Sequence, residues 1–556
     1  MTRYLRALLC ATALLLITAA VPAPPESQPR AGNADTPPNI VFILADDLSK
    51  AVTPYMSELA ELAGEGVSFE QFITSNSQCC PSRTTMFTGK YPHNHEVLTN
   101  TWPLGGFGQF LAHGYLDDSL SIYLKDAGYR TGLLGKYLNQ YQIAGDTDGV
   151  DPPDYPRDFV PPGWDEWFAF NGSDRYFDYT TLDGVDGVTD RDTYGTEPED
   201  YRTDVLGDRA SEFLERSGDG PFFLLLTPNA VHSARPAKDL QQPDSYRFPP
   251  APRDRSASPN RPPSWGEPEF ELGDCGDPVD GGCAPLADED ARAENFNVIA
   301  TDAPKWAPTE PMTEEEVATA LDEFVQQVQM AQGVDDLLGR VRDEISAAGL
   351  ADNTYVFFGS DNGYHLGEHA LRSGKQTAYD HDVRLPFIVA PPGGTTPTQR
   401  SFVASNVDVL PTLLDIAGVT MPPVDGQSLE PMITDSALEP VERATLIEHE
   451  EGPEEAATFR EDPDSIKTLK EEPTRYMAFR TSTYLYVDYS TLDTKAPGER
   501  NGEFYDLLGD PFELTNLWPA LTKAEKGELN DYLGDYAACE ADSCRELSFL
   551  PPAITP

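Results

Sequence analysis

Short, mostly apolar runs recur along the chain, with helical patterns between them. The runs lie at 40–44, 131–134, 222–226, 355–358 and 387–390. Such continuous runs are typical of parallel strands that are buried on both faces. We therefore predict an α/β fold with a large, mainly parallel sheet flanked by helices.

Two of the intervening segments are strongly helical. The longer spans 314–348 and begins with a capping box, because Thr313 is followed three residues later by Glu316. Gly333 is a possible break in this helix. The shorter helix runs over 407–416.

The composition and pattern of the sequence change after about residue 426. The stretch 439–472 is acidic, polar and poor in strand signals. Beyond it we expect strands at 476–480 and 484–489, an aromatic turn region at 504–507 and a helix at 523–532. We predict a catalytic domain over 39–430, with a Pro-rich surface excursion at 236–302, and a small C-terminal α+β domain with an antiparallel sheet over 431–556.

The N-terminus has the pattern of an export signal. Arg3 and Arg6 precede a short apolar segment, and small residues follow it. We predict a signal peptide over 1–23, a flexible linker over 24–38 and a secreted protein without a membrane span.

The cysteines agree with an oxidising compartment. Cys275 and Cys283 form one locally spaced pair, and Cys539 and Cys544 form another. Each pair could close a small loop as a disulfide. Cys80 would remain as a buried thiol.

The formal net charge is -53. So acidic a chain does not fit a nucleic-acid-binding protein, which needs a basic surface, and is repelled by anionic membranes. An anionic substrate would need a local concentration of positive charge within this repulsive field.

Polar residues directly follow four of the predicted strands. They are Asp46, Asp47, Lys136, His232, Asp361 and Asn362. Because sites in α/β sheets form beyond the carboxyl ends of the strands, we expect these side chains to converge. The aspartates and the asparagine supply only oxygen ligands, which suit Ca²⁺ or Mg²⁺. The alternative is that an acidic chain places aspartate pairs in turns and caps.

The most specific motif begins at Cys79, which is followed by Cys80, Pro81, Ser82 and Arg83, and then by a Thr-Gly pair at 88–89. On its own, a cysteine pair would more often be structural. The complete motif resembles the signature of the type I sulfatases. The wider segment 79–97 resembles the N-acetylglucosamine-6-sulfatase and arylsulfatase branch, and the resemblance extends over about 39–518.

The resemblance implies an alkaline-phosphatase-like fold in which a maturation enzyme converts Cys79 to Cα-formylglycine. One hydroxyl of the hydrated aldehyde would attack sulfur and form a covalent sulfo-enzyme, and the other would later expel sulfate. The family pattern also implies one Ca²⁺, with Mg²⁺ as the less favoured ion. Its ligands would be Asp46, Asp47, residue 79, Asp361 and Asn362.

The same resemblance assigns further catalytic groups. Arg83 would hold the nucleophile and the metal-binding carboxylates, Lys136 and Lys375 would contact the sulfate, and His232 would protonate the leaving alcohol. Ordinary surface lysines and a structural histidine are the alternatives.

One departure from the family pattern concerns the segment that carries Lys136. Many arylsulfatases have Lys-Trp-His there, whereas this chain has no histidine, and Asn139 could replace part of its role. His365 and His369 could line the substrate pocket or form a structural turn.

These observations favour a secreted sulfatase that acts on sulfate monoesters of sugars, of the N-acetylglucosamine-6-sulfate type, or on aryl sulfates. The first alternative is a formylglycine-dependent phosphonate monoester hydrolase or phosphodiesterase. The second is a non-catalytic protein that binds sulfated glycans with Cys79 unconverted.

Overall fold

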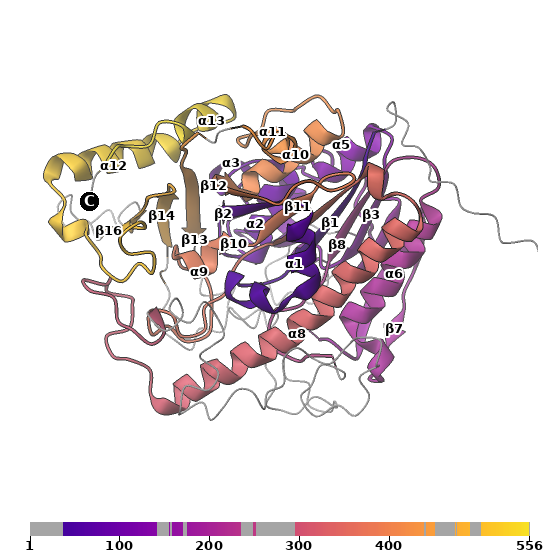
Figure 1. The fold of residues 1–556 in the computed structure, drawn as a ribbon, viewed down its shortest axis with the longest axis horizontal. Helices are drawn as coiled ribbons and strands as arrows, with labels where there is room; N and C mark the ends of the chain where they lie inside the picture. The colour runs from indigo at the N-terminus through magenta and orange to yellow at the C-terminus, as the bar shows by residue number, and fades with distance from the viewer. Residues whose placement is uncertain are drawn as a thin grey trace, which may run out of the picture.

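The computed structural model describes residues 37–141, 155, 158–170, 175–234, 248–251, 295–438, 441–450, 473, 475–489 and 502–554. A large sheet with helices on both faces forms most of the molecule, and a smaller sheet lies at one end (Figure 1). The predicted signal peptide, most of the linker, most of the excursion at 236–302, and the Cys275 and Cys283 pair lie outside the described residues.

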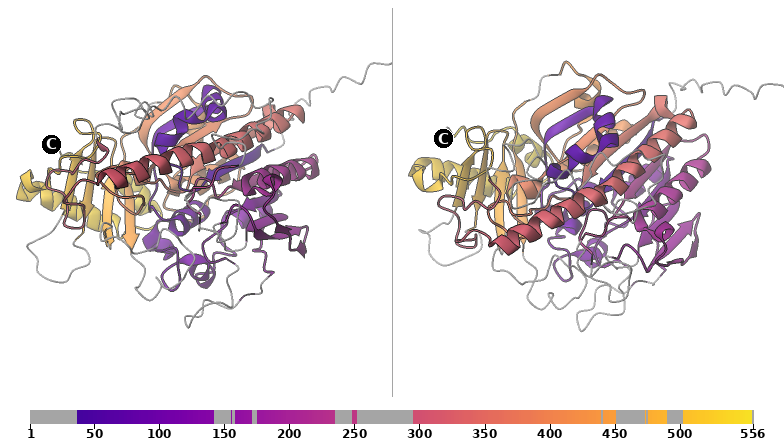
Figure 2. Two further views of the ribbon diagram at one scale, coloured as in Figure 1. Left: turned by 90° about the horizontal axis from the view of Figure 1, so that it is seen from below. Right: turned by 60° about the horizontal axis from the view of Figure 1, so that its bottom comes forward.

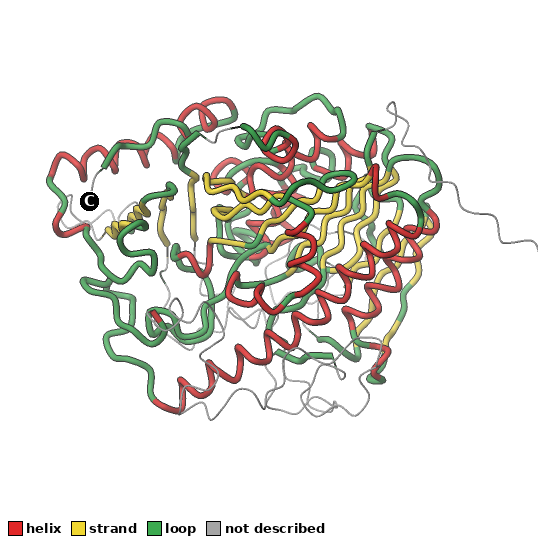
Figure 3. Tube along the Cα trace, viewed as in Figure 1, coloured by secondary structure: helices red, strands yellow, loops and turns green. Residues whose placement is uncertain are grey.

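The large sheet has 12 strands, which Figure 3 shows side by side. In spatial order they are β10 (Arg384–Leu385), β2 (Val67–Ile73), β11 (Phe387–Ala390), β9 (Thr354–Ser360), β1 (Asn39–Ala45), β8 (Phe222–Thr227), β3 (Arg130–Gly135), β4 (Glu166–Phe170), β5 (Tyr179–Val185) and β6 (Val188–Asp190), with β12 (Thr398–Ser405) paired to β2 and β7 (Thr193–Tyr194) to β5. The central strands β9, β1, β8, β3 and β4 are parallel. Four of the five apolar runs are therefore confirmed as parallel strands.

The fifth run, β11, is a strand but was wrongly predicted to be parallel. It pairs antiparallel with both β9 and β2. The segment between β9 and β11 contains no crossover helix that returns the chain to the other edge of the sheet. The chain therefore re-enters the sheet from the edge at which β9 ends, and it runs in the opposite direction.

Alternate residues of β1 face two separate cores. Val41 and Ile43 pack with helices α1 (Ser57–Gly64), α6 (Arg202–Arg216) and α8 (Glu314–Ala347). Ile40 and Phe42 pack with residues of five other helices. These are α2 (Cys79–Thr88), α4 (Gly106–Ala112), α5 (Leu120–Asp126), α10 (Val409–Ile416) and α11 (Glu430–Thr434). A strand buried on both faces has to be apolar at every position, which explains the continuous runs.

Helix α8 confirms the predicted capping box and shows no break at Gly333. The Glu316 amide donates to Thr313 Oγ1 at 3.3 Å, and the Thr313 amide donates to Glu316 Oε2 at 2.8 Å. A Cβ added at Gly333 would lie at ordinary van der Waals distance from Tyr201 and Thr203. The helix is therefore packed against these residues at Gly333, and it continues through this position. Among the described residues, no helix combines the length and the apolar composition needed to cross a bilayer.

The small sheet is antiparallel, in the order β13 (Thr445–Glu450), β14 (Arg475–Arg480), β15 (Tyr484–Asp488) and β16 (Gly502–Asp506). One face packs on α12 (Lys523–Tyr536), which is drawn in yellow beside the small sheet in Figure 2, and the other packs on a segment that includes Tyr379 and Val383. Short helices complete the described structure: α3 (Pro92–His95), α9 (Asp380–Val383), α11 (Glu430–Thr434) and α13 (Asp542–Ser548). The domain boundary at 430/431 stays a prediction.

Two expectations for this region were wrong. The described part of the polar stretch 439–472 contains β13, and residues 504–506, expected to open a turn region, belong to strand β16, so that the turn begins only at Leu507. Both strands acquire their apolar surroundings only when the small sheet docks, so local composition gave little signal. The predicted strands at 476–480 and 484–489 and the helix beginning at Lys523 are confirmed.

The cysteines agree with the predictions where they are described. Cys539 and Cys544 form a disulfide. Cys80 is a fully buried free thiol.

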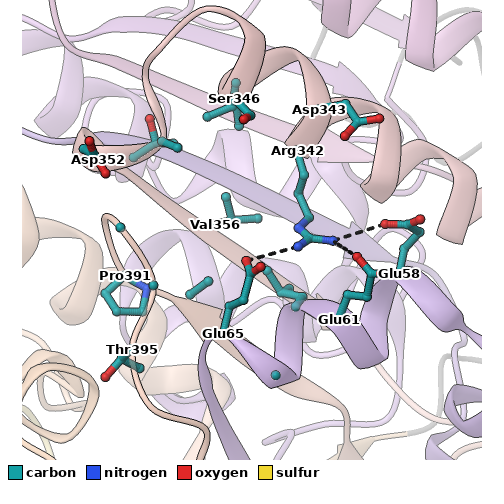
Figure 4. Close-up of a pocket in the computed structure, with 18 of the residues that line it drawn as sticks. Glu58, Glu61, Glu65, Arg342, Asp343, Ser346, Asp352, Val356, Pro391 and Thr395 are labelled. Atoms are coloured by element: carbon teal, nitrogen blue, oxygen red, sulfur yellow. Dashed lines mark hydrogen bonds and ion pairs between the residues drawn. The ribbon is translucent and has the colours of Figure 1, made fainter. Parts of the chain in front are cut away.

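A pocket of about 810 Å³ lies at the edge of the sheet opposite to the carboxyl end of β9. In Figure 4, Arg342 of α8 reaches Glu58 and Glu61 of α1 and Glu65, the residue that follows this helix. Its guanidinium lies 3.1 Å from Glu58, 3.5 Å from Glu61 and 3.1 Å from Glu65. Because the single positive charge of Arg342 lies beside three carboxylates, it offsets part of their mutual repulsion and links α1 to α8.

We expect Arg342→Met to lower the free energy of unfolding by about 1 kcal/mol at low salt, because the three glutamates then repel one another without compensation. Salt should reduce this loss, since the groups are partly exposed. Denaturant unfolding at two salt concentrations measures the effect, with Arg175→Met, which removes an exposed pair with Asp178, as the control. An equal loss at both salt concentrations would contradict the electrostatic explanation.

Candidate active site

The polar residues predicted to converge do meet at one edge of the large sheet. Asp46 and Asp47 follow β1, Lys136 follows β3, and Asp361 follows β9. Because β9, β1, β8 and β3 are adjacent and parallel, their carboxyl ends lie together. The site is therefore built on a rigid edge, with these aspartates and Lys136 one or two residues beyond a buried strand.

Cys79 is the first residue of α2, a helix whose ten residues are all buried. Its Sγ lies 3.4 Å from Asp46 Oδ1 and 3.9 Å from Asp47 Oδ1, and Lys375 Nζ approaches it to 3.2 Å. Burial, followed by the charge of Asp46, raises the pKa of the Cys79 thiol to about 12. An unmodified thiol at this position would stay protonated at neutral pH and would be a poor nucleophile.

Arg83 lies one helical turn after Cys79 and points into the same cluster. Its Nε donates to Asp361 Oδ2 at 2.7 Å, and its Nη1 donates to the Lys136 carbonyl at 2.8 Å. Burial alone would lower the pKa of Arg83, but Asp361 and Asp46 outweigh burial and raise it. The arginine thereby fixes both the strand end that carries Asp361 and the one that carries Lys136.

Two lysines neutralise the aspartates that follow β1. Lys136 Nζ lies 2.5 Å from Asp46 Oδ2, and Lys375 Nζ lies 2.6 Å from Asp47 Oδ1. Burial disfavours the charged form of each group. The charge of Asp46 nevertheless raises the pKa of Lys136. Lys136, together with His232 and Arg83, holds the pKa of Asp46 well below its usual value. Both groups of the Lys136–Asp46 pair are therefore charged at neutral pH.

His232 also faces the cluster. Its Nδ1 lies 2.8 Å from the Ser233 carbonyl, which can only accept, so Nδ1 carries a hydrogen. Its Nε2 lies 3.7 Å from Asp47 Oδ2. The Tyr176 hydroxyl lies 2.8 Å from both the Asn229 and the His232 carbonyls and holds this loop in place. Sequence reasoning missed Tyr176, because only the folded chain brings it to the loop.

The oxygen donors of this cluster fit a hard divalent cation. Ligand atoms of Asp46, Asp47, Cys79 and His232 all lie within 4.8 Å of one another. Among the described residues, Asn362 Oδ1 is buried without a hydrogen-bond partner, while its Nδ2 donates to Asp47 Oδ1 at 2.6 Å. A buried amide oxygen beside a carboxylate cluster is suited to a cation ligand.

Asp361 belongs to the same cluster but is bonded differently. Its Oδ1 accepts the backbone amides of Asp47, at 3.2 Å, and of Asn362, at 2.8 Å, and its Oδ2 accepts Arg83. In the described structure it therefore holds the two segments that carry the other oxygen donors.

The remaining predicted residues lie around this cluster. His365 Nδ1 contacts Asp382 at 3.0 Å, and the His369 ring stacks on Tyr379 at 4.2 Å. Both histidines are buried. Asn139 Oδ1 is buried and has no hydrogen-bond partner among the described residues.

Comparison with known proteins places this geometry in a family. The model described as Sulfatase matches residues 38–419, and one described as N-sulphoglucosamine sulphohydrolase, C-terminal, matches residues 367–533. The chain is 28% identical over 540 residues to human N-acetylglucosamine-6-sulfatase, covering 93% of this chain and 87% of that protein.

Solved structures show the same fold. A protein in complex with its substrate D-glucosamine-2-N,6-O-disulfate superposes with a TM-score of 0.63 at 20% identity, covering 92% of this chain and 99% of the other. The phosphonate monoester hydrolase of Agrobacterium radiobacter superposes with a TM-score of 0.55 at 20% identity, covering 90% and 96%. These likenesses confirm the predicted fold class.

Proposed function

This chain belongs to the sulfatase family, and on that premise we propose that it hydrolyses sulfate monoesters of sugars with residue 79 as the nucleophile. The observation that carries the proposal is the convergence on Cys79 of Asp46, Asp47 and Lys375. Oxidation of Cys79 to formylglycine by a maturation enzyme would supply a hydrated aldehyde, one hydroxyl of which attacks sulfur while the other later expels sulfate.

The charges of the cluster suit a cation and an anionic ester together. Three carboxylates, of Asp46, Asp47 and Asp361, are balanced by Arg83, Lys136 and Lys375, as shown by the contacts within the cluster. A divalent cation, preferably Ca²⁺, held by the three aspartates, Asn362 and residue 79 would make the site positive and would lower the pKa of the attacking hydroxyl. The local positive charge required in so acidic a chain thus comes from the site itself.

The chain's own groups have distinct roles in this proposal. Arg83 is immobilised by Asp361 and the Lys136 carbonyl, and it keeps the turn that carries residue 79 in register with β9. Lys375, which is buried, and Lys136, whose side chain is 11% exposed, carry the ammonium groups that would bind the sulfate oxygens. His232 would donate a proton from Nε2 to the leaving sugar oxygen, because its Nδ1 is engaged by the Ser233 carbonyl.

The substrate class and the destination of the protein are part of the proposal. Similarity to N-acetylglucosamine-6-sulfatases supports a 6-sulfated glucosamine as substrate. Secretion is supported by the export pattern at 1–23 and by the Cys539–Cys544 disulfide, which persists in oxidising compartments.

The proposal is tested on protein produced together with a formylglycine-generating enzyme. The proteolytic peptide carrying residue 79 should have lost the thiol sulfur and gained an aldehyde oxygen by mass. Initial rates should then be higher on an aryl sulfate than on the matching aryl phosphonate, and N-acetylglucosamine 6-sulfate should release sulfate. A faster rate on the phosphonate would favour a phosphonate monoester hydrolase, and an intact thiol in protein from its native host would favour a glycan-binding role.

A further inference from the structure

Lys375 lies in a long loop, yet its ammonium group is placed closely against the reactive residue. The segment between β9 and α9 contains no helix or long strand. Lys375 is nevertheless 1% exposed, and its Nζ lies 3.2 Å from Cys79 Sγ and 2.6 Å from Asp47 Oδ1. A flexible lysine can be held so closely only if contacts on both sides fix its backbone.

The contacts on both sides lead to Asp382, a fully buried residue of α9. Its carboxylate accepts Thr377 Oγ1 at 2.6 Å and the Thr377 amide at 2.9 Å, and it lies 3.0 Å from His365 Nδ1. Its carbonyl accepts the Gly363 amide at 2.9 Å. One residue thereby joins the start of the loop, which carries the metal-site residues, to the segment that follows Lys375.

A backbone bridge completes the connection on the other side of Lys375. The His365 amide donates to the Gly374 carbonyl at 2.8 Å, and the Gly374 amide donates to the His365 carbonyl at 3.1 Å. Lys375 therefore lies between Gly374, which is bound to His365, and Thr377, which is bound to Asp382. Because Asp382 also contacts His365, its carboxylate is connected to both ends of the segment 374–377.

The backbone between these two anchors is strained. Gln376 has a φ of 87°, in the left-handed region that disfavours residues other than glycine. It is tied to the residue preceding Cys79 by a bond from Gln78 Nε2 to Gln376 Oε1 at 3.0 Å, and Ser77 Oγ donates to the Thr377 carbonyl at 3.2 Å. Such a conformation persists only where its surroundings enforce it, and Asp382 supplies the enforcement on the Thr377 side.

We propose that Asp382 is a positioning residue that acts through Lys375, by fixing residues 374–377 so that the lysine faces residue 79. Within the described part of the chain none of its hydrogen bonds reaches Cys79, Asp46 or Asp47, so it acts on the reaction through Thr377 and His365. The inference rests on the proposed function, in which Lys375 binds the sulfate group. It adds a residue that the sequence pattern alone did not single out.

A double-mutant cycle tests this inference. Asp382→Asn keeps the size of the side chain but loses its charge and one acceptor, and we expect kcat/KM on an aryl sulfate to fall about 10- to 100-fold. In the Lys375→Ala background the same change should cost less than about twofold, because the group being positioned is gone. Equal losses in both backgrounds would show that Asp382 acts elsewhere and would overturn the proposal.

Two further comparisons separate positioning from a general loss of structure. Thr377→Ser retains the hydroxyl donor to Asp382 and should keep the wild-type rate, whereas Thr377→Val should lower it. Asp335→Asn is the matched control, because Asp335 is also a buried carboxylate that accepts backbone amides, of Glu58 and Leu59, but lies in α8. It should lower stability without altering kcat/KM. A Thr377→Ser variant as impaired as Thr377→Val would overturn the proposal.

The same cycle is measured on the affinity for inorganic sulfate, the reaction product. This reports on Lys375 even if the chain hydrolyses a different ester, so a failure of the proposed function is recognised separately from a failure of the positioning role. We expect Asp382→Asn to weaken sulfate binding several-fold in the wild-type background and to leave it unchanged in the Lys375→Ala background. Additive losses in sulfate affinity would overturn the inference.

Discussion

A Cys79→Ser variant is expected to lose steady-state turnover of an aryl sulfate by about 10³-fold or more. Serine offers one hydroxyl in place of the two of a hydrated aldehyde. It can accept the sulfuryl group from the substrate, but no second hydroxyl remains to expel it. The variant should therefore accumulate a peptide with a sulfated serine at position 79, which mass spectrometry detects as the addition of one SO₃ group. Cys79→Ala should show neither turnover nor this adduct.

The adjacent residue provides the matched control. Cys80 is equally buried, but it packs in the core formed by α2 and the sheet and lies outside the cluster of charged groups. Cys80→Ala should cost about 1 kcal/mol of stability, should keep the formylglycine at residue 79 and should retain most of the turnover. Full activity of Cys79→Ser or Cys79→Ala would refute the proposed nucleophile.

The strands that carry the site could be predicted because burial on both faces leaves an unmistakable pattern. β1, β8 and β9 are largely apolar and β3 contains a short apolar stretch, and aspartate, asparagine and lysine follow beyond the strand ends. The position of Cys79 came from a motif whose residues all lie along one helix, α2, and its C-cap. The convergence of these groups followed from topology, since adjacent parallel strands end at the same edge.

Elements whose environment is created by the fold could not be predicted in this way. β2 and β12 lie near one end of the large sheet and carry polar residues. β13 lies in an acidic stretch of the sequence. It docks beside the segment before Cys79, where the Glu448 amide donates to the Ser75 carbonyl at 2.8 Å. The orientation of β11 depends on where the chain re-enters the sheet, which no local pattern encodes. Tyr176 and Asp382 likewise act through contacts with residues distant in sequence.

The balance of charge in the site leads to the second large effect. Without a cation, Arg83, Lys136 and Lys375 neutralise the three aspartates. Asp361→Asn removes one negative charge but preserves the side-chain volume, so the site becomes net positive and its affinity for a divalent cation falls. We expect the variant to lose bound Ca²⁺ after dialysis and to lose turnover by about 10²- to 10³-fold.

Metal analysis, kinetics and thermal unfolding should be performed together on this variant. Ca²⁺ should raise the melting temperature of the wild type, because a ligand that binds only the folded state stabilises it, and should have little effect on Asp361→Asn. Asp352→Asn is the control: it removes an exposed aspartate just before β9, at the pocket on the opposite edge of the sheet, and should leave metal content and turnover unchanged. An Asp361→Asn variant that turns over at the wild-type rate without bound metal would refute the metal assignment. Loss of turnover with full metal content would instead restrict Asp361 to anchoring Arg83, whose guanidinium it contacts at 2.7 Å.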